Sequence, residues 1–481
     1  MSLTAAMNTA QSIFNNTSKQ TTVVSTNISN AQNPNYVRRN AALTTSGNGA
    51  VVASIERAQS EPLLRQTILT GSMSSGQSTL LAGLKEIRDL LGNNDYDNSP
   101  SAKLQTLYNA LSSYAGSPGE ATLGASVVTA AQDLVDNLNV TSTEVQGVRQ
   151  RADAQIKTKV DELNNLLAQF ETANNEVVSA NALGADPSTP LDKRETLLKK
   201  ISEIVGVSTV LRTNGDMAIY TSEGTTLFER IPRAVSFVPT NTYTALVTGN
   251  QVFIDGTAIT PGQGGDTNAA GSLQALLQIR DEAAPKFQSQ LDEIARGLIA
   301  SFAETGPGGL STPVAGLFTN GVNSTIPPAG VVQPGLSWSI KVNALAKATP
   351  TTIRDGGMNG AAYVVNTSGS GYSTLIDSYA QAMKATRAFD NTTDVKGNLS
   401  LMTYASSSAG WLEAMRSTAS AANETKTAMY SRASEAYSNE TGVNLDEELS
   451  LLLDIEQSYK AATKLVSTID EMMKALLAVA G

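Results

Sequence analysis

The stretch Gly442-Val443-Asn444-Leu445-Asp446-Glu447-Glu448 decides the fold, because a run without Pro or Gly follows it as far as Ala480. Asn444 is a typical helix N-cap, and the three acids place negative charge on the first turn, where the helix dipole is positive. Beyond them, apolar residues recur at alternating steps of three and four, which is the spacing of a coiled-coil seam. The members of this seam are Leu452, Ile455, Tyr459, Ala462, Val466, Ile469, Met473, Leu476 and Ala480.

A helix of this length, roughly 50 Å at 1.5 Å per residue, leaves its seam exposed unless a second helix covers it. Each large apolar side chain left in water costs roughly 1.5–3 kcal/mol, so the pattern predicts a partner. The opposite end of the chain has a comparable but weaker seam, in which two positions are Thr. Its members are Leu3, Met7, Ala10, Phe14, Thr17, Thr21, Val24 and Ile28.

We therefore expect the two terminal helices to pair with each other and then with neighbouring subunits. Leu445 and Leu449, together with the two seams, form the predicted assembly interface. An ordinary helical hairpin within one chain is the simpler alternative. Ordering the backbone of roughly 65 terminal residues costs on the order of 1 kcal/mol each or more, which a two-helix contact offsets poorly. The helices are accordingly expected to order on assembly.

Composition excludes several classes of protein. The chain has 481 residues, a formal net charge of −10, and neither His nor Cys. An acidic chain without a basic cluster is a poor partner for nucleic acid or anionic lipid. The absence of His and Cys removes the usual proton-transfer group, the thiolate nucleophile and the commonest metal ligands, so we expect no catalytic site, metal or cofactor.

The sequence has no apolar run long enough to span a membrane and no secretory signal peptide at its N-terminus. Export of the protein would therefore use a route that does not depend on such a signal.

Periodicity along the chain predicts a mainly helical fold with an inserted β region, in a nested order in which the chain ends pair. Long helical tracts with few aromatic residues indicate a rod, and a hairpin signal at Asn214-Gly215-Asp216 opens the β region. The expected parts are a terminal coiled coil (1–35 with 442–481), an extended connector (36–60), a helical rod (61–205 with 266–304 and 361–441) and a β-rich outer domain (206–265 with 305–360).

Two other function classes compete with a structural role. A coiled-coil signalling protein would share the Ala-rich helices, but it predicts a helical hairpin without a β insertion. A carboxylate-dependent hydrolase would need an acidic cluster, and Asp446, Glu447 and Glu448 are the densest one. Their position on the first helical turn explains these acids by capping, so the catalytic interpretation is the weaker one.

With these residues in view, the sequence resembles the flagellar hook-associated protein 1 family, the junction proteins between hook and filament. Residues 442–448 and the heptad helix after them match the C-terminal signature of that family. The N-terminal residues resemble a motif shared by flagellar rod, hook and hook-associated proteins, and residues 191–194 with 204–207 resemble an internal family motif. The N-terminal motif residues are Asn27, Ile28, Ser29, Asn30, Tyr36, Val37 and Arg38.

The resemblance implies a structural component of the flagellum that assembles as a ring at the hook–filament junction. Implied partners are other copies of the chain, hook protein, the adjacent junction protein and an export chaperone that shields the face from Leu445 to Leu476. It also implies export through the flagellar type III apparatus and an extracellular location. A second junction protein or a flagellin-like protein is the alternative within the same group. Segment 305–360 is too short for the further β domain that some members carry.

Overall fold

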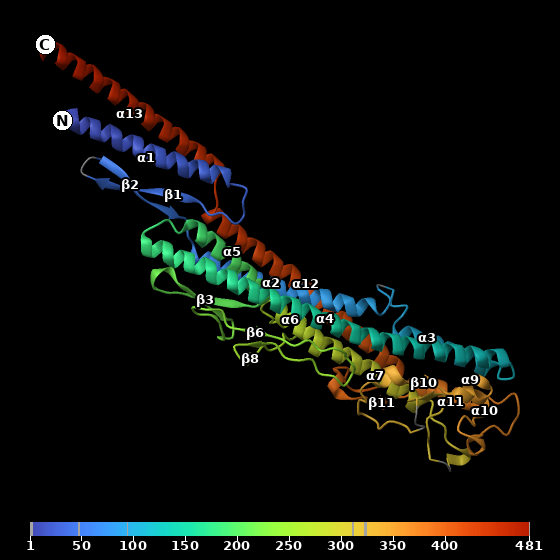
Figure 1. Cartoon of the computed structure of the whole chain (residues 1–481). Helices are drawn as coiled ribbons and strands as arrows, with labels where there is room; N and C mark the ends of the chain where they lie inside the picture. Colours follow the sequence, from blue (N-terminus) through green and yellow to red (C-terminus); the bar gives the residue numbers. More distant parts are fainter. Residues whose placement is uncertain (1–2, 47–48, 94, 310–311, 322–324, 481) are drawn as a thin grey trace. The chain divides into compact units, whose positions relative to one another are not determined.

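The computed structural model describes residues 3–46, 49–93, 95–309, 312–321 and 325–480 (Figure 1). The chain forms two compact units. The first comprises Met1–Ser74, Glu162–Val235 and Lys426–Gly481, and the second comprises Ser75–Asp161 and Ser236–Thr425. The fold is mainly helical with small antiparallel sheets, as the sequence predicts.

In the first unit, the terminal helices α1 (Leu3–Ser29) and α13 (Leu445–Ala480) lie side by side (Figure 1). The ring of Phe14 meets the ring of Tyr459 edge to face, with 5.2 Å between centroids. The two helices therefore pair within a single chain.

The segment expected to be an extended connector contains an antiparallel hairpin. Its strands are β1 (Arg39–Ser46) and β2 (Gly49–Arg57), with a bulge between Ala42 and Leu43. The hairpin packs on α1 through Asn16, whose amide donates to the Ala50 carbonyl at 2.5 Å and accepts from the Val52 amide at 2.9 Å. One face of α1 is thus occupied by the hairpin and another by α13.

The rest of the first unit combines helix ends with a small sheet. Its three strands lie in the order β3–β4–β5, and the predicted hairpin is confirmed, with Val207 opposite Thr221. At the turn, Asn214 and Gly215 both adopt positive φ, as the sequence signal requires. The elements are α2 (Glu61–Asp89), α5 (Ser188–Ile204), β3 (Val207–Leu211), β4 (Met217–Thr221), β5 (Thr226–Phe228) and β6 (Val235–Ser236).

The long helices confirm the predicted rod-like tracts. Ser99 caps α3 (Pro100–Gly116) by accepting from the Ala102 amide, and α4 (Ala121–Leu183) is one helix of 63 residues. The tract from Ser272 to Ser301 contains α6 (Ser272–Gln278), a π-helical turn and α7 (Ala284–Ser301). The turn, Ile279–Ala283, lies just before Pro285, where the sequence suggests a kink.

Apart from α12, the remaining elements of the second unit are short. Antiparallel pairs join β7 to β8, β9 to β10 and β11 to β12. The bounds are β7 (Phe253–Ile254), β8 (Thr257–Ala258), β9 (Phe318–Thr319), α8 (Leu336–Ser339), β10 (Lys341–Val342), α9 (Ala344–Ala348), α10 (Thr352–Asp355), α11 (Thr374–Lys384), β11 (Arg387–Ala388), β12 (Asn398–Leu399) and α12 (Leu401–Thr441).

The sequence pattern also predicts strands at residues 244–247 and 338–342. The first prediction is wrong, and the second is confirmed only at its end, where β10 lies. Residues 244–247 form a turn, because the guanidinium of Arg149 binds the carbonyls of Thr244 at 3.0 Å and Val247 at 2.7 Å. Residues 338–342 are strand only at their end. The buried carboxylate of Asp292 accepts from the Ser337 amide and hydroxyl, at 2.8 and 2.6 Å, and so holds this segment as the short helix α8.

A buried charge cluster fixes the loop around residue 245. Arg280 is fully buried and donates to Asp153 at 2.7 Å and to the Asn250 carbonyl at 2.7 Å. Tyr243 also donates to Asp153, at 2.6 Å, and burial and this bond raise the pKa of its phenol to about 12. These bonds satisfy charges that would otherwise be costly to bury.

Two kinds of feature, membrane-spanning helices and acidic metal sites, are absent from the described ranges. No helix there combines the length and hydropathy needed to cross a bilayer. Nor do three or more acidic side chains gather there in a way that could hold a metal ion.

The backbone in the middle of α2 packs closely against the backbone of the loop before α6. A Cβ atom on Gly76 would lie 2.5 Å from the Ala269 carbonyl oxygen, a backbone atom. Gln77 holds the same loop, donating to the Gly265 carbonyl at 2.8 Å and accepting from the Thr267 amide at 3.0 Å.

We expect Gly76→Ala to destabilise the second unit by about 1–3 kcal/mol, because the overlap with the loop outweighs the gain in helix propensity. Gly410→Ala, in α12, is the matched control, since a Cβ there meets nothing within 4 Å. It should gain up to about 1 kcal/mol. Urea denaturation of both variants measures the difference. A stabilised Gly76→Ala variant would contradict this packing.

Candidate functional site: the joint between the chain ends

The N-terminal motif is organised by Asn27, a buried residue near the end of α1. Its side-chain oxygen accepts from the Tyr36 hydroxyl at 2.7 Å and the Arg39 amide at 3.1 Å. Its side-chain nitrogen donates to the Arg39 carbonyl at 2.9 Å and to the Glu448 carboxylate at 3.0 Å. All four bonding positions of one amide are therefore used, and the fourth reaches the C-terminal helix.

Glu448, on the first turn of α13, is the C-terminal partner and is fully buried. One carboxylate oxygen accepts from Asn27, and the other accepts from Nε of Arg38 at 2.7 Å. Such charge-assisted hydrogen bonds are shorter and stronger than neutral ones. We call Asn27, Tyr36, Arg38 and Glu448 the terminal joint. It unites the N-terminal and C-terminal motif residues in one buried hydrogen-bond network.

The acids beside Glu448 have other roles. Asn444 caps α13 as predicted, because its side chain accepts from the Asp446 amide at 3.0 Å. Asp446 and Glu447 are exposed, and Glu447 pairs with Arg38 at 3.3 Å. The capping interpretation holds for the exposed acids. It is wrong for Glu448, whose carboxylate is committed to Asn27 and Arg38.

The turn between α12 and α13 is tied to the same joint. The Arg38 amide donates to the Thr441 carbonyl at 2.9 Å, and the Gly442 amide donates to the Ser438 carbonyl at 2.7 Å. A Cβ atom on Gly442 would lie 2.5 Å from that Ser438 oxygen, so this turn requires glycine.

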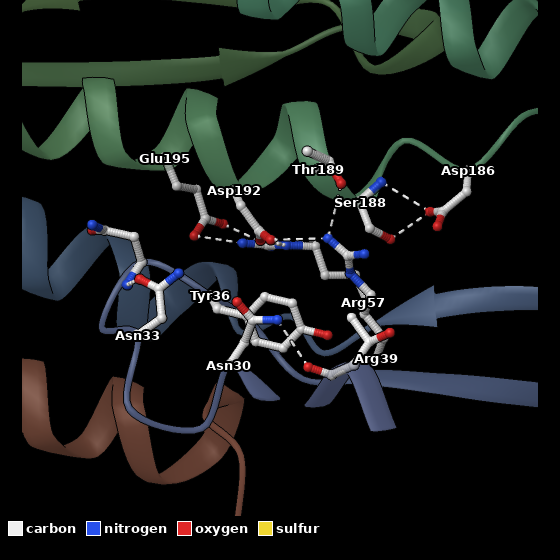
Figure 2. Close-up of polar contacts among 12 residues, drawn as sticks. Asn30, Asn33, Tyr36, Arg39, Arg57, Asp186, Ser188, Thr189, Asp192 and Glu195 are labelled. Carbon is white, nitrogen blue, oxygen red and sulfur yellow. Dashed lines mark hydrogen bonds and ion pairs between the residues drawn. The ribbon is translucent and has the colours of Figure 1, made fainter. Parts of the chain in front are cut away.

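A second group of charges lies on the other side of the Asn30–Tyr36 loop, against α5 (Figure 2). Arg57 binds Asp192 at 2.7 Å and Glu195 at 2.8 Å, and Arg39 binds Asp192 at 3.3 Å. Tyr437 of α12 donates to Glu195 at 2.6 Å. We call Arg39, Arg57, Asp192, Glu195 and Tyr437 the ionic cluster. It fastens the β1–β2 hairpin to α5 and α12.

Burial shapes the electrostatics of the ionic cluster. Desolvation raises the pKa of the Asp192 carboxyl, although Arg57 and Arg39 oppose the shift. Desolvation lowers the pKa of Arg57, but its bonds to Glu195 and Asp192 outweigh that effect and raise it overall. Burial and the Glu195 carboxylate raise the pKa of the Tyr437 phenol. In the ionic cluster, the positive charges of the two arginines are compensated by the carboxylates of the two acids.

The internal motif also has a structural role. Arg194 is buried and donates to the Asn174 side chain at 3.0 Å and to the Gly215 carbonyl at 2.5 Å. Desolvation lowers its pKa to about 10, which leaves it charged at neutral pH. This side chain attaches the β3–β4 turn to α4 and α5.

Comparison with known proteins finds similarity over the internal and the C-terminal motifs. A family model described as the flagellar hook-associated protein FlgK helical domain matches residues 84–313. A second model, described as the flagellar basal body rod FlgEFG protein C-terminal, matches residues 434–479. Flagellar hook-associated protein 1 of Salmonella typhimurium is 23% identical over 313 residues, or 62% of this chain and 56% of that protein. The chain is thus similar to flagellar hook-associated protein 1 over these residues.

Hook-associated proteins of other bacteria are similar to the chain as well. The Escherichia coli protein is 21% identical, with the same coverage, and the Bacillus subtilis protein is 23% identical over 220 residues, or 42% of this chain and 43% of that one. The alignment thus spans about half the length of these relatives. The flagellar hook junction protein FlgK from Burkholderia pseudomallei shares the fold, with a TM-score of 0.58 at 14% identity, covering 77% of this chain and 99% of that one.

The predicted interface residues of this chain are only partly covered. On α1, Ala10 and Val24 are buried, Leu3, Phe14 and Ile28 are half-buried, and Met7 is exposed. On α13, Ile455 and Ile469 are buried, and Leu452 and Val466 are half-buried. The exposed members are Leu445, Leu449, Tyr459, Met473 and Leu476.

The sequence did not identify Arg57, Glu195 or Tyr437, or the inward role of Glu448. Charged residues at these positions belong to no spacing pattern, because the fold brings them together from four separate segments. A buried partner for Arg38 could have been suspected only from the density of motif residues at both chain ends.

We expect Glu448→Gln to destabilise the pairing of α1 and α13 by about 2 kcal/mol, because the amide cannot accept from both donors and leaves a buried donor unpaired. Glu447→Gln is the matched control, with an expected loss under about 1 kcal/mol for an exposed pair. Denaturation, with amide hydrogen exchange across both helices, measures the effect. Equal losses in the two variants would show that the buried joint contributes nothing special.

Proposed function

We propose that this protein is a structural component of the bacterial flagellum that forms the junction between hook and filament. The observation that carries the proposal is the terminal joint, which positions two terminal helices as a pair and leaves the outer face of α13 exposed. The similarity to flagellar hook-associated protein 1 supports the assignment. Because the aligned region covers about half of the relatives, the role of the whole protein stays a proposal.

The proposed mechanism is assembly through the terminal helices. On α13, Leu449 and Leu453 are 50% and 59% exposed, and near the end of the helix Leu476 and Leu477 are 55% and 69% exposed. The single helix α1 cannot cover both sides of α13, so these side chains stay exposed unless a second surface packs against them. In an assembled ring, neighbouring copies would supply that surface and bury the remaining members of both seams.

The proposed partners are copies of the same chain, the hook protein and the adjacent junction protein. Before assembly, an export chaperone would cover the exposed face of α13. The export route would be the flagellar type III apparatus, and the final location the extracellular flagellum.

Cells that lack this protein should keep their hooks and release filament subunits into the medium. The reason is that the filament would have no base on which to grow. Electron microscopy of the cells and immunoblotting of the medium measure the outcome, with re-expression of the intact chain as the control. Filaments of normal length and number on the deletion strain would overturn the proposed function.

A second prediction separates assembly from folding. Leu449→Glu with Leu453→Glu should abolish complementation of that strain, because the charges occupy the proposed contact between copies. The thermal unfolding midpoint of the purified chain should change by less than about 2 °C, since both side chains are exposed. Leu183→Glu is the matched control, because Leu183 is 83% exposed and lies outside the terminal helices. Full complementation by the double variant would exclude this face from assembly.

A further inference from the structure

Two clefts in the first unit flank the Asn30–Tyr36 loop. One, of about 680 Å³, lies between this loop, α5 and the turn that leads into α13. The other, of about 570 Å³, lies between the loop, the end of α1, Gln169 of α4, and α5. Figure 2 shows Asn30, Asn33 and Tyr36 of the loop opposite Asp192 and Glu195 of α5. Thr196 lines both clefts.

The α5 side of the clefts carries uncompensated positive charge. Its two acids are already used, since Asp192 binds Arg39 and Arg57, and Glu195 binds Arg57 and Tyr437. Within the described part of the chain, neither Lys199 nor Lys200 has a salt-bridge partner.

Lys199 lines the larger cleft, and Lys200 lines the smaller one. The ammonium of Lys199 lies over the Tyr437 ring, 4.6 Å from its centroid, and burial lowers its pKa. A basic site of this kind on a chain of net charge −10 favours an acidic partner. We call Lys199 and Lys200 with the two clefts the lysine site.

The outer face of α13 has the complementary chemistry. Asp446, Leu449, Leu453 and Glu456 follow one another at steps of three, four and three, so they lie along one face of the helix. All four are exposed, whereas Glu448 and Ile455 point the other way and are buried. We call these four residues the outer stripe. It presents the carboxylate of Asp446 and that of Glu456, which pairs with Lys460 in the single chain, beside two leucines that are more than one third exposed.

We propose that the lysine site of one copy binds the outer stripe of α13 from a second copy. This inference rests on the proposed function and names the contact through which copies would associate. The two surfaces are different, so the contact is heterologous. Each copy offers one of each kind, and the contact therefore extends from copy to copy rather than stopping at a dimer.

The absence of cysteine makes the contact testable by cross-linking. Thr196→Cys would carry a thiol at the lysine site, and Gln457→Cys would carry one beside the outer stripe. The two single-cysteine full-length chains are co-expressed in cells without the native copy. Mild oxidation of isolated flagella should give a dimer band on a non-reducing gel, because a disulfide requires the two Cα atoms to come within about 7 Å. Each variant alone, and Leu183→Cys paired with Gln457→Cys, should give none.

Charge reversal tests the chemistry of the contact. Lys199→Glu with Lys200→Glu, added to the Thr196→Cys chain, should lower the cross-linked fraction about tenfold, because like charges then face each other. Adding Asp446→Lys and Glu456→Lys to the Gln457→Cys chain should restore it. Lys347→Glu, an exposed lysine in α9, is the matched control and should leave the fraction unchanged.

Each outcome has one meaning. A normal filament count without the dimer band overturns the inference and leaves the proposed function standing. A cross-link that charge reversal does not weaken, or that the opposite reversal does not restore, also overturns the inference. Chains with Ser at both positions contain no thiol and are the negative control for the disulfide. A dimer band from the serine chains would show that the band is not the proposed cross-link, and would also overturn the inference.

Discussion

The pairing of the two chain ends depends on the hydrogen bonds that the buried carboxylate of Glu448 accepts. A buried carboxylate is costly unless donors surround it, and here the donors come from the far end of the chain, Asn27 and Arg38. The pairing of α1 with α13 is otherwise weak, since its contact seam includes Ala10, Thr17 and Ala462. Small residues allow close approach but bury little area. A directional polar network therefore fixes the register that apolar packing leaves loosely specified.

The ionic cluster extends this constraint into the hairpin. Arg57 is at the end of β2 and binds two carboxylates of α5, so the strand, the helix and the terminal joint hold each other in place. Ion pairs of this burial contribute modestly to net stability, because desolvation offsets most of their attraction. Their effect is on specificity: a wrongly placed hairpin would leave Asp192 and Glu195 without partners.

Sequence reasoning predicted what depends on local spacing and missed what depends on distant contacts. The heptads from Leu452 and the cap at Asn444 locate α13, and the Asn214-Gly215 turn locates the hairpin, because each signal lies within a few residues. The failures at 244–247 and 338–342 arose where Arg149 and Asp292 take the backbone groups that strands would use. Glu448 could not be assigned from sequence, since an acid on a first turn suits both the helix dipole and a buried partner. The family motifs identified Asn27 and Arg38 but gave no reason for them.

The terminal joint has a consequence for the integrity of the chain itself. Asn27 and Glu448 are separated by 421 positions in sequence, so their bond can form only after the chain has been made as far as α13. A product that stops before Glu448 leaves Asn27 with an unused donor and Arg38 without its buried anion. The fold thereby distinguishes chains that reach α13 from chains that end before it, and in the shorter chains the N-terminal helix is held by the β1–β2 hairpin without its partner helix.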